Sequence, residues 1–143
     1  MGEERREQVS CLNVNITGGF WQEKQKLFRD VTVDAVYDRF EETGRFEALN
    51  CAWKEGMPNR PHIFWDSDVA KWIEGAAYFL LKQRDEELEA RVDELIDLGL
   101  PKVWTVNACA MGHCLITLYE ATGEQRYWDI VMSKIHYIQH DAL

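Results

Sequence analysis

The sequence predicts a mainly α-helical fold in which successive helices pair as antiparallel hairpins. Apolar residues recur at three- and four-residue spacing in one stretch after another, which is the pattern of amphipathic helices. Short polar or glycine-containing turns separate these stretches, and helices joined by short turns pack antiparallel. The chain has 143 residues, of which 46% are hydrophobic, so it is long enough for one domain with its own core.

Composition excludes several classes of partner. The formal net charge is −9, which argues against nucleic acid or an anionic membrane as a binding surface. No apolar run is long enough to span a membrane, and residues 1–7 do not have the pattern of a signal peptide. The four cysteines form no close-paired framework, so we expect a reduced, cytoplasmic protein.

The central stretch predicts a buried helix over residues 67–82. Asp66 and Ser67 are candidate N-cap residues, and Asp68 follows where the helix dipole favours negative charge. One face of the predicted helix is apolar along its whole length, and the residues on it are Val69, Trp72, Ile73, Ala76, Ala77 and Leu80. We therefore expect this helix to be anchored in the core while its polar start faces a cavity.

The N-terminal region predicts a short strand followed by a helix. Leu12, Val14 and Ile16 alternate with polar residues, as in a half-buried strand that ends at a pair of glycines. A helix over residues 21–29 opens with Phe20 and Trp21. For these two aromatic side chains we favour core packing over stacking against a sugar.

A second helix is predicted over residues 32–43, with Thr32 as its N-cap and Gly44 as its stop. Its apolar stripe consists of Val33, Val36, Tyr37 and Phe40. The stretch from Phe46 to Ile63 has no periodicity and contains two prolines, so we expect a loop. Loops of this length in compact domains are often functional.

Three further helices are predicted in the C-terminal half. The first, over 86–98, is capped by Asp85 and has Leu88, Val92, Leu95 and Ile96 on one face. The second covers 108–121, and its stripe is Met111, Leu115, Leu118 and Tyr119. The third covers 124–138, and its stripe is Tyr127, Val131, Ile135 and Ile138.

Three motifs resemble one known family. The stretch Phe-Trp-Asp-Ser-Asp-Val-Ala-Lys-Trp-Ile-Glu-Gly-Ala-Ala-Tyr, residues 64–78, resembles the signature of the β-L-arabinofuranosidases of glycoside hydrolase family 127. The pattern Val14-x-Ile16-x-x-x-Phe20-Trp21 and the turn Glu42-Thr43-Gly44-Arg45 match the same family. The resemblance implies an (α/α)6 toroid, of which residues 1–143 would form a single, incomplete N-terminal segment of two to three hairpins.

The chain departs from the family pattern after residue 99. Met111-Gly112-His113 and the stretch 119–123 match, but Val106 stands where the family has a histidine that contacts the sugar. An internal deletion would explain this. The family's cysteine nucleophile, acid/base glutamate and zinc ligands belong to motifs that this sequence does not contain. We therefore expect no catalytic residue, no zinc cofactor and no activity from the chain alone.

A substitute zinc site from Cys109, His113 and Cys114 is not expected. Cys109 and His113 share a helical face, but Cys114 points away from Cys109 and no fourth ligand is evident. We expect His113 to be a packed helix residue. Lys71 and Glu74 are expected to make contacts on the helix surface or between helices.

Three residues are candidates for binding substrate. Phe64 matches the family phenylalanine that lines the sugar subsite, and aromatic side chains offer a platform to the C–H face of a sugar. A core position would explain Phe64 equally well. Asp66 and Asp68 resemble the carboxylate pair of glycosidases, although helix capping is the simpler explanation and the one we favour.

Three functions are compatible with the sequence. The first is an N-terminal fragment of a glycoside hydrolase, inactive alone, with carbohydrate as its partner. The alternatives are a non-catalytic helical-hairpin module that binds another protein, and a vestigial carbohydrate-binding fragment. In each case we expect self-association through an uncovered toroid edge, with Trp104, Trp128 and Ile130 nearby.

Overall fold

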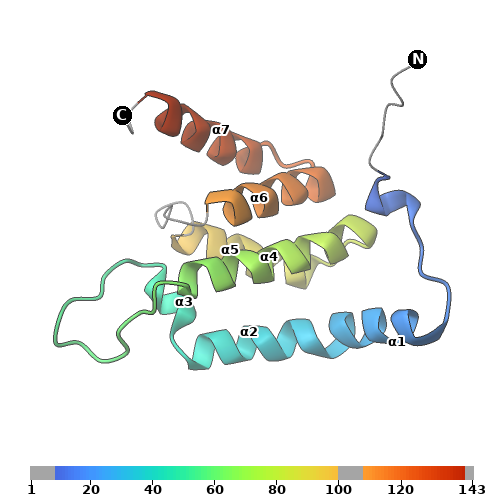
Figure 1. The fold of residues 1–143 in the computed structure, drawn as a ribbon, viewed down its shortest axis with the longest axis horizontal. Helices are drawn as coiled ribbons and strands as arrows, with labels where there is room; N and C mark the ends of the chain where they lie inside the picture. Colours follow the sequence, from blue (N-terminus) through green and yellow to red (C-terminus); the bar gives the residue numbers. More distant parts are fainter. Residues whose placement is uncertain (1–8, 100–107, 141–143) are drawn as a thin grey trace, which may run out of the picture.

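The structure is a computed structural model, and it describes residues 9–99 and 108–140. Its helices follow one another along the chain without any strand within these two ranges (Figure 1). The elements are η1 (Cys11–Asn13), α1 (Gly19–Leu27), η2 (Phe28–Thr32), α2 (Val33–Glu42), α3 (Arg45–Ala48), α4 (Trp65–Lys82), α5 (Glu86–Leu98), α6 (Ala108–Thr122) and α7 (Gln125–His140). The predicted helical fold is therefore confirmed, and the predicted strand is not.

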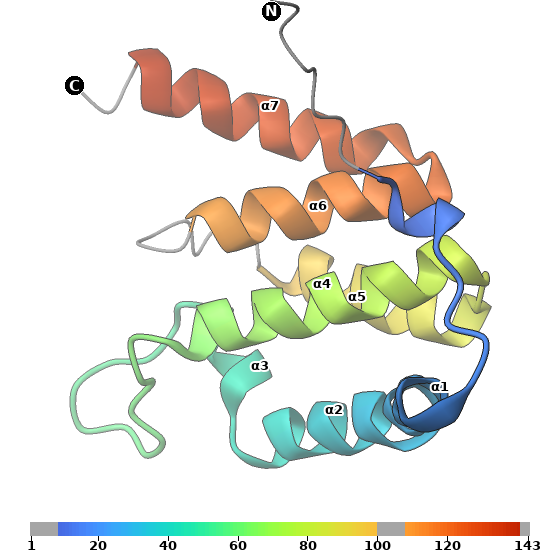
Figure 2. The same ribbon diagram turned by 45° about the vertical axis from the view of Figure 1, so that its right-hand side comes forward.

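Helices α4 and α6 run side by side through the middle of the molecule and share its most extensive contact (Figures 1 and 2). Helix α7 packs on α6, while α2, α3 and α5 pack on α4. In Figure 2, α1 and α2 lie along one side of this stack and α7 along the other. No helix in the described ranges has the length and apolar character needed to cross a membrane.

The predicted apolar face of α4 is the centre of the core. All six of its residues are buried, and Ile73 and Val69 are completely inaccessible to solvent. Trp72 is 8% exposed, and its indole Nε1 donates a hydrogen bond of 3.0 Å to the Val33 carbonyl of α2. This bond satisfies the polar end of a large buried side chain and ties α4 to α2.

Helix α5 begins as the sequence predicts. The Asp85 carboxylate accepts hydrogen bonds from the backbone N–H groups of Glu87 and Leu88, at 3.1 and 3.0 Å. The predicted stripe of α5 is buried throughout. Arg29 also pairs with Asp85, so the cap of α5 is joined to the segment between α1 and α2.

Helices α6 and α7 follow their predicted stripes only in part. Leu115, Leu118, Tyr127 and Val131 are buried. Ile135 is 40% exposed, so its prediction as a core residue is wrong. The side chains of Met111 and Ile138, also predicted in these stripes, lie outside the described residues.

A polar network joins α5 to α7. The Tyr127 hydroxyl donates a hydrogen bond to Asp93 of α5, and Arg126 pairs with the same carboxylate. Burial and the bond to Asp93 raise the pKa of Tyr127, so its hydroxyl remains a proton donor across the physiological range. This network holds the completely buried Tyr127 side chain against the middle of α5.

Helices α1 and α2 form one nearly continuous rod, because the residues between them make the wider turns of a π-helix. Thr32 has helical backbone angles, and its side chain makes no capping hydrogen bond. The prediction of Thr32 as an N-cap is therefore wrong, since the chain is already helical when it reaches this residue. The predicted stop is confirmed, because Gly44 adopts a left-handed conformation with φ of 76°.

The N-terminal segment does not have its predicted structure. Leu12 belongs to the short helix η1, and Val14 and Ile16 lie in irregular backbone with 51% and 43% of their surfaces exposed. Phe20 and Trp21 are 58% and 68% exposed, so their assignment to the core is also wrong. The physical reason is shared: no described element packs over this segment, and alternation or aromatic content alone does not bury a side chain.

The stretch predicted as a loop over 46–63 begins with a core element. Helix α3 places Phe46 in the core, and Leu49 behind it is completely buried. Gly99, at the end of α5, lies against this turn so closely that a Cβ atom there would be 2.3 Å from the Leu49 carbonyl oxygen. Irregular backbone then runs from residue 51 to residue 64. The loop prediction holds for that part only.

Candidate functional site

The start of α4 contains the three predicted binding residues, at its N-cap position and in its first turn. Phe64 occupies the N-cap position, without a side-chain capping bond. Asp66 instead lies in the first turn and accepts a hydrogen bond of 2.8 Å from the N–H of Ser67, while the Ser67 hydroxyl donates back to the Phe64 carbonyl at 2.9 Å. The prediction that Asp66 or Ser67 caps the helix is wrong, because the helix begins at Trp65, before either residue.

Two cations hold the Asp68 carboxylate. Arg45 Nε lies 3.6 Å from Oδ2, and Lys71 Nζ lies 3.7 Å from Oδ1. One-third of the Asp68 side chain is exposed, so the carboxylate is oriented by its partners and still accessible to a ligand. The first turn of α4 also favours negative charge at Asp66 and Asp68 through the helix dipole.

Arg45 is a site residue that the sequence analysis missed. It follows the turn after α2, where Thr43 donates to the Arg39 carbonyl at 2.6 Å and accepts a hydrogen bond from Arg45. The Arg45 guanidinium lies over the rings of Phe40 and Trp65, at 5.0 and 5.4 Å from their centroids. Its Nε is enclosed, with no hydrogen-bond partner among the described residues. Two separate sequence motifs, Glu42–Arg45 and Phe64–Tyr78, thus meet at one point.

Phe64, at the N-cap position of α4, is exposed. Half of its surface (51%) faces solvent, so the alternative that it is a core aromatic is wrong. The imidazole of His62 lies 5.2 Å from the Phe64 ring, between centroids, and its Nδ1 accepts a hydrogen bond from the Phe64 N–H. The neighbouring loop is held by its own contacts, since the Trp53 indole donates to the carbonyls of Met57 and Pro58. The start of α4 therefore carries an exposed aromatic ring at its N-cap position and two carboxylates in its first turn.

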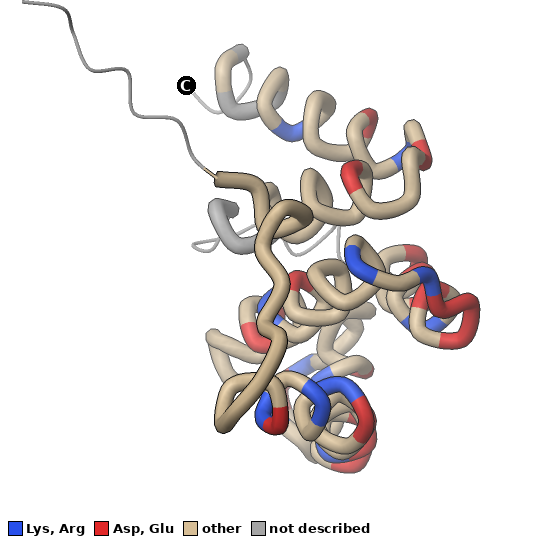
Figure 3. Tube along the Cα trace, turned by 90° about the vertical axis from the view of Figure 1, so that its right-hand side faces the viewer, with Lys and Arg blue, Asp and Glu red and all other residues tan. Residues whose placement is uncertain are grey.

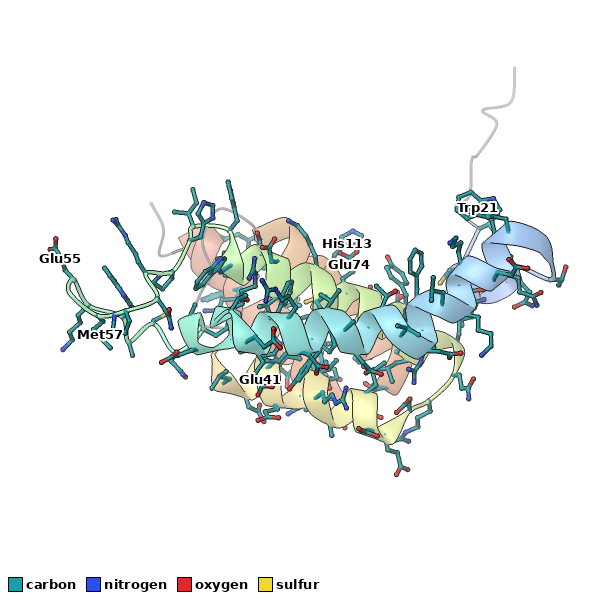
Figure 4. All side chains as sticks on the ribbon, turned by 90° about the horizontal axis from the view of Figure 1, so that it is seen from below. Trp21, Glu41, Glu55, Met57, Glu74 and His113 are labelled. Atoms are coloured by element: carbon teal, nitrogen blue, oxygen red, sulfur yellow. The ribbon has the colours of Figure 1, made fainter. Side chains whose placement is uncertain are left out.

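His113 does not occupy its predicted place. Its side chain is 72% exposed, and its Nδ1 lies 3.5 Å from Glu74 Oε1 across the α4–α6 contact. Figure 4 shows the two side chains next to each other. The expectation that His113 is packed is wrong because it points away from the buried face of α6, which holds Cys114 and Leu115. The predicted contacts of Glu74 and Lys71 are confirmed.

The described residues do not fit a zinc ion. Within residues 9–99 and 108–140, no three His, Cys, Asp or Glu side chains are grouped in a way that can hold a metal. Cys114 is completely buried, and this burial raises the pKa of its thiol to about 12. A cysteine binds zinc as its thiolate, so this buried thiol is a poor ligand. Cys109 and Trp104, which entered the sequence predictions, lie where side chains are not described.

Comparison with known proteins finds a matching family and a curated relative whose named activity differs from that of the family. The family described as β-L-arabinofuranosidase, GH127 catalytic domain, matches residues 13–104. The unsaturated rhamnogalacturonyl hydrolase YesR of Bacillus subtilis (strain 168) is 27% identical over 120 residues, which are 82% of this chain and 31% of that protein.

Two solved structures have a similar fold. The GH127 β-arabinofuranosidase BT3674 superposes with a TM-score of 0.71 and 24% identity, over 85% of this chain and 25% of that one. Ara127N-Se, a GH127 β-L-arabinofuranosidase from Geobacillus stearothermophilus T6, gives a TM-score of 0.68 and 23% identity, over 88% of this chain and 25% of that one. The chain therefore spans about a quarter of the length of these enzymes and under a third of YesR.

Proposed function

Because the chain belongs to the β-L-arabinofuranosidase family, glycoside hydrolase family 127, we propose that it contributes one wall of a carbohydrate-binding subsite. The wall consists of Phe64, Asp66 and Asp68 at the start of α4. In this proposal the helices α4 to α7 correspond to hairpins of the (α/α)6 toroid that the family resemblance implies. The observation that carries the proposal is an exposed Phe64 at the N-cap of α4, the helix whose first turn contains a carboxylate held by Arg45 and Lys71.

The chemistry of this wall suits a sugar better than an ionic ligand. An exposed aromatic face receives the C–H groups of a furanose ring, and carboxylate oxygens accept hydrogen bonds from its hydroxyl groups. Arg45 and Lys71 orient the Asp68 carboxylate and so fix the direction from which it accepts hydrogen bonds. The carboxylates at this wall do not favour an anionic ligand such as a phosphate.

A single wall binds weakly. Small-molecule sites bury most of the ligand surface, whereas one wall leaves the opposite side of the sugar in water. We therefore expect a dissociation constant of about 1 mM or weaker for a monosaccharide glycoside. No catalytic residue is assigned within these 143 residues, because the wall offers carboxylates and a platform but no identified nucleophile.

Saturation-transfer NMR with methyl β-L-arabinofuranoside tests this proposal. We expect transfer to the ring protons of the sugar in the wild-type chain and its loss in Phe64→Ala. Ile63→Ala is the matched control, because Ile63 is the adjacent residue and is 77% exposed, yet has no part in the proposed wall. Transfer that is absent from the wild type, or unchanged in Phe64→Ala, would contradict the proposal.

Hydrolysis is a separate measurement. On a chromogenic β-L-arabinofuranoside, with or without added zinc and a thiol reductant, we expect no release above the buffer rate. Turnover needs nucleophile, acid/base and positioning groups together, and loss of such groups removes several kcal/mol of transition-state stabilisation. Release that Asp66→Asn or Asp68→Asn abolished would show that these carboxylates are catalytic.

A protein-interaction module remains the second candidate function. It is favoured by the number of large apolar side chains that the described residues leave exposed, among them Trp21, Phe28 and Trp128. Such residues mark interaction surfaces when they are contiguous. This function does not exclude the carbohydrate wall, because the two use different parts of the molecule. Trp21 belongs to α1, whereas Phe64 lies at the start of α4.

A further inference from the structure

A second surface, away from Phe64, is apolar, exposed and contiguous. Two grooves of about 420 and 450 Å³ adjoin along α4, and they share Cys11 and Tyr78 as lining residues. The first lies between α1 and α4, and the second between the N-terminal segment and α6. We call this surface the open face, and its apolar side chains are Val9, Ile16, Trp21, Phe28, Tyr78 and Ile116.

The side chains of the open face are well exposed. Trp21 and Val9 are each 68% exposed, and even the least exposed member, Ile116, reaches 36%. Gly75 of α4 lines the first groove, and a Cβ atom there would meet nothing within 4 Å. Figure 3 looks onto this side and shows that the segment before α1 carries no charge on it. The open face therefore has exposed aromatic side chains, and its first groove has space at Gly75 for an incoming side chain.

The open face also has ends of opposite charge. At the α1 end the first groove is lined by Lys24 and Lys82, with no carboxylate among its lining residues. At the α6 end the second groove is lined by Glu120, with Glu74 beside His113 nearby. A twofold axis through the face would place the basic end of one copy on the acidic end of the other. Such contacts oppose, at the interface itself, the repulsion between two chains of net charge −9.

We propose that a second copy of this chain packs on the open face, forming an isologous dimer through the N-terminal segment, α1, α4 and α6. Trp21 and Phe28 of each copy enter the groove of the other, and Lys24 approaches the partner's acidic end. This interface differs from the one expected from the sequence, which lay around Trp104, Trp128 and Ile130. It is independent of the carbohydrate proposal, since it uses none of the residues of the Phe64 wall.

Two cysteines provide a test within the unaltered chain. Cys11 lines both grooves, whereas Cys51 is also exposed but lies outside the open face. Iodoacetamide labelling, followed peptide by peptide with mass spectrometry, is compared in dilute and concentrated protein. We expect the Cys11 rate to fall about tenfold once the concentration is well above the dimer dissociation constant, because only the monomer reacts. Cys51 should keep its rate.

Charge reversal distinguishes a second copy from any other occupant. Lys24→Glu and Glu120→Lys should each weaken the dimer about tenfold by sedimentation equilibrium, because each places like charges opposite one another. The double variant should regain most of the wild-type affinity, since its charges are complementary again across the twofold axis. Ile63→Glu, a charge added at an exposed residue outside the open face, should have no effect.

A chain that stays monomeric to millimolar concentration overturns the proposal, as does equal labelling of Cys11 and Cys51 at every concentration. A dimer whose affinity the double variant does not restore also overturns it, because the contact would then lie elsewhere. Circular dichroism accompanies each variant, and the thiol measurement stands without any substitution.

Discussion

Helices α4 and α1 contain the same proportion of aromatic residues, four of 18 and two of nine, yet they end in opposite environments. Eight residues of α4 are buried, whereas no residue of α1, which the structure describes completely, is buried. Helix α4 is surrounded by α2, α3, α5 and α6, while α1 contacts mainly the π-helical turn that follows it. Aromatic content alone therefore does not decide burial in this chain, because a helix also needs an apolar face and neighbours that cover it.

Substitution of Trp72 and of Trp21 should give the largest difference in the free energy of unfolding. Trp72→Ala removes a buried ring and its hydrogen bond to the Val33 carbonyl, and should lower the free energy of unfolding by about 3–5 kcal/mol. Trp21→Ala, measured in dilute monomer, should change it by less than about 0.5 kcal/mol, because the side chain is 68% exposed. Urea denaturation of both variants makes the comparison. Equal losses would mean that α1 is as well packed as α4.

Substitutions at the predicted N-cap residues should give a smaller difference in the free energy of unfolding. Asp85→Ala should cost about 1 kcal/mol, because its carboxylate accepts the first N–H groups of α5. Asp85→Asn should cost less, since the amide oxygen can still cap the helix. Thr32→Ala should stay within about 0.5 kcal/mol, because Thr32 makes no capping bond. A larger loss at Thr32 than at Asp85, in the same urea experiment, would reverse this ranking.

The smallest effect at neutral pH concerns the proton of the Cys114 thiol. Burial raises the pKa of this thiol from 9.0 to about 12, so the native state holds its proton more tightly than the unfolded chain does. Its contribution to stability is therefore complete below about pH 9 and is lost as the pH rises toward 12. Thermal melts of the wild type and Cys114→Ala between pH 7 and pH 11 should converge as the pH rises. Parallel curves would show that the thiol does not titrate with unfolding.

Much of the packed region could be predicted from the sequence. The stripes of α4 and α5 and the Asp85 cap depend on residues within a few turns of one another, and helical periodicity reports such local relations directly. The burial of Trp72 followed from its position in the α4 stripe. The end of α2 at Gly44 was equally local, because a glycine that adopts positive φ stops a helix wherever it occurs.

The failures concern relations that sequence periodicity does not record. Val14 and Ile16 alternate as a strand does, but no described strand pairs with them. Asp66 resembles a cap, but α4 begins at Trp65, two residues before the predicted start at residue 67. Phe46 and Leu49 enter the core through a single short helix, which is too brief to show a period.

The candidate site also contains residues that a local motif reveals and one residue whose role depends on the fold. Phe64, Asp66 and Asp68 were identified because they are adjacent in one conspicuous motif. Arg45 was missed, although it belongs to a motif that the sequence analysis had singled out. Its role depends on the fold bringing the turn after α2 against the start of α4, where it meets Asp68 and Trp65. The co-occurrence of the two motifs was the signal that could have suggested this contact.

Native-state hydrogen exchange in dilute solution tests the contrast between α4 and α1 most directly. The amides of α4 and α6 should exchange only through global unfolding, because they lie in the centre of the core. The amides of α1 should exchange at least about a hundredfold faster through local opening, since few apolar contacts hold that helix. This result would show that one chain contains a packed half and an uncovered half. Equal protection of α1 and α4 in the monomer would contradict the account.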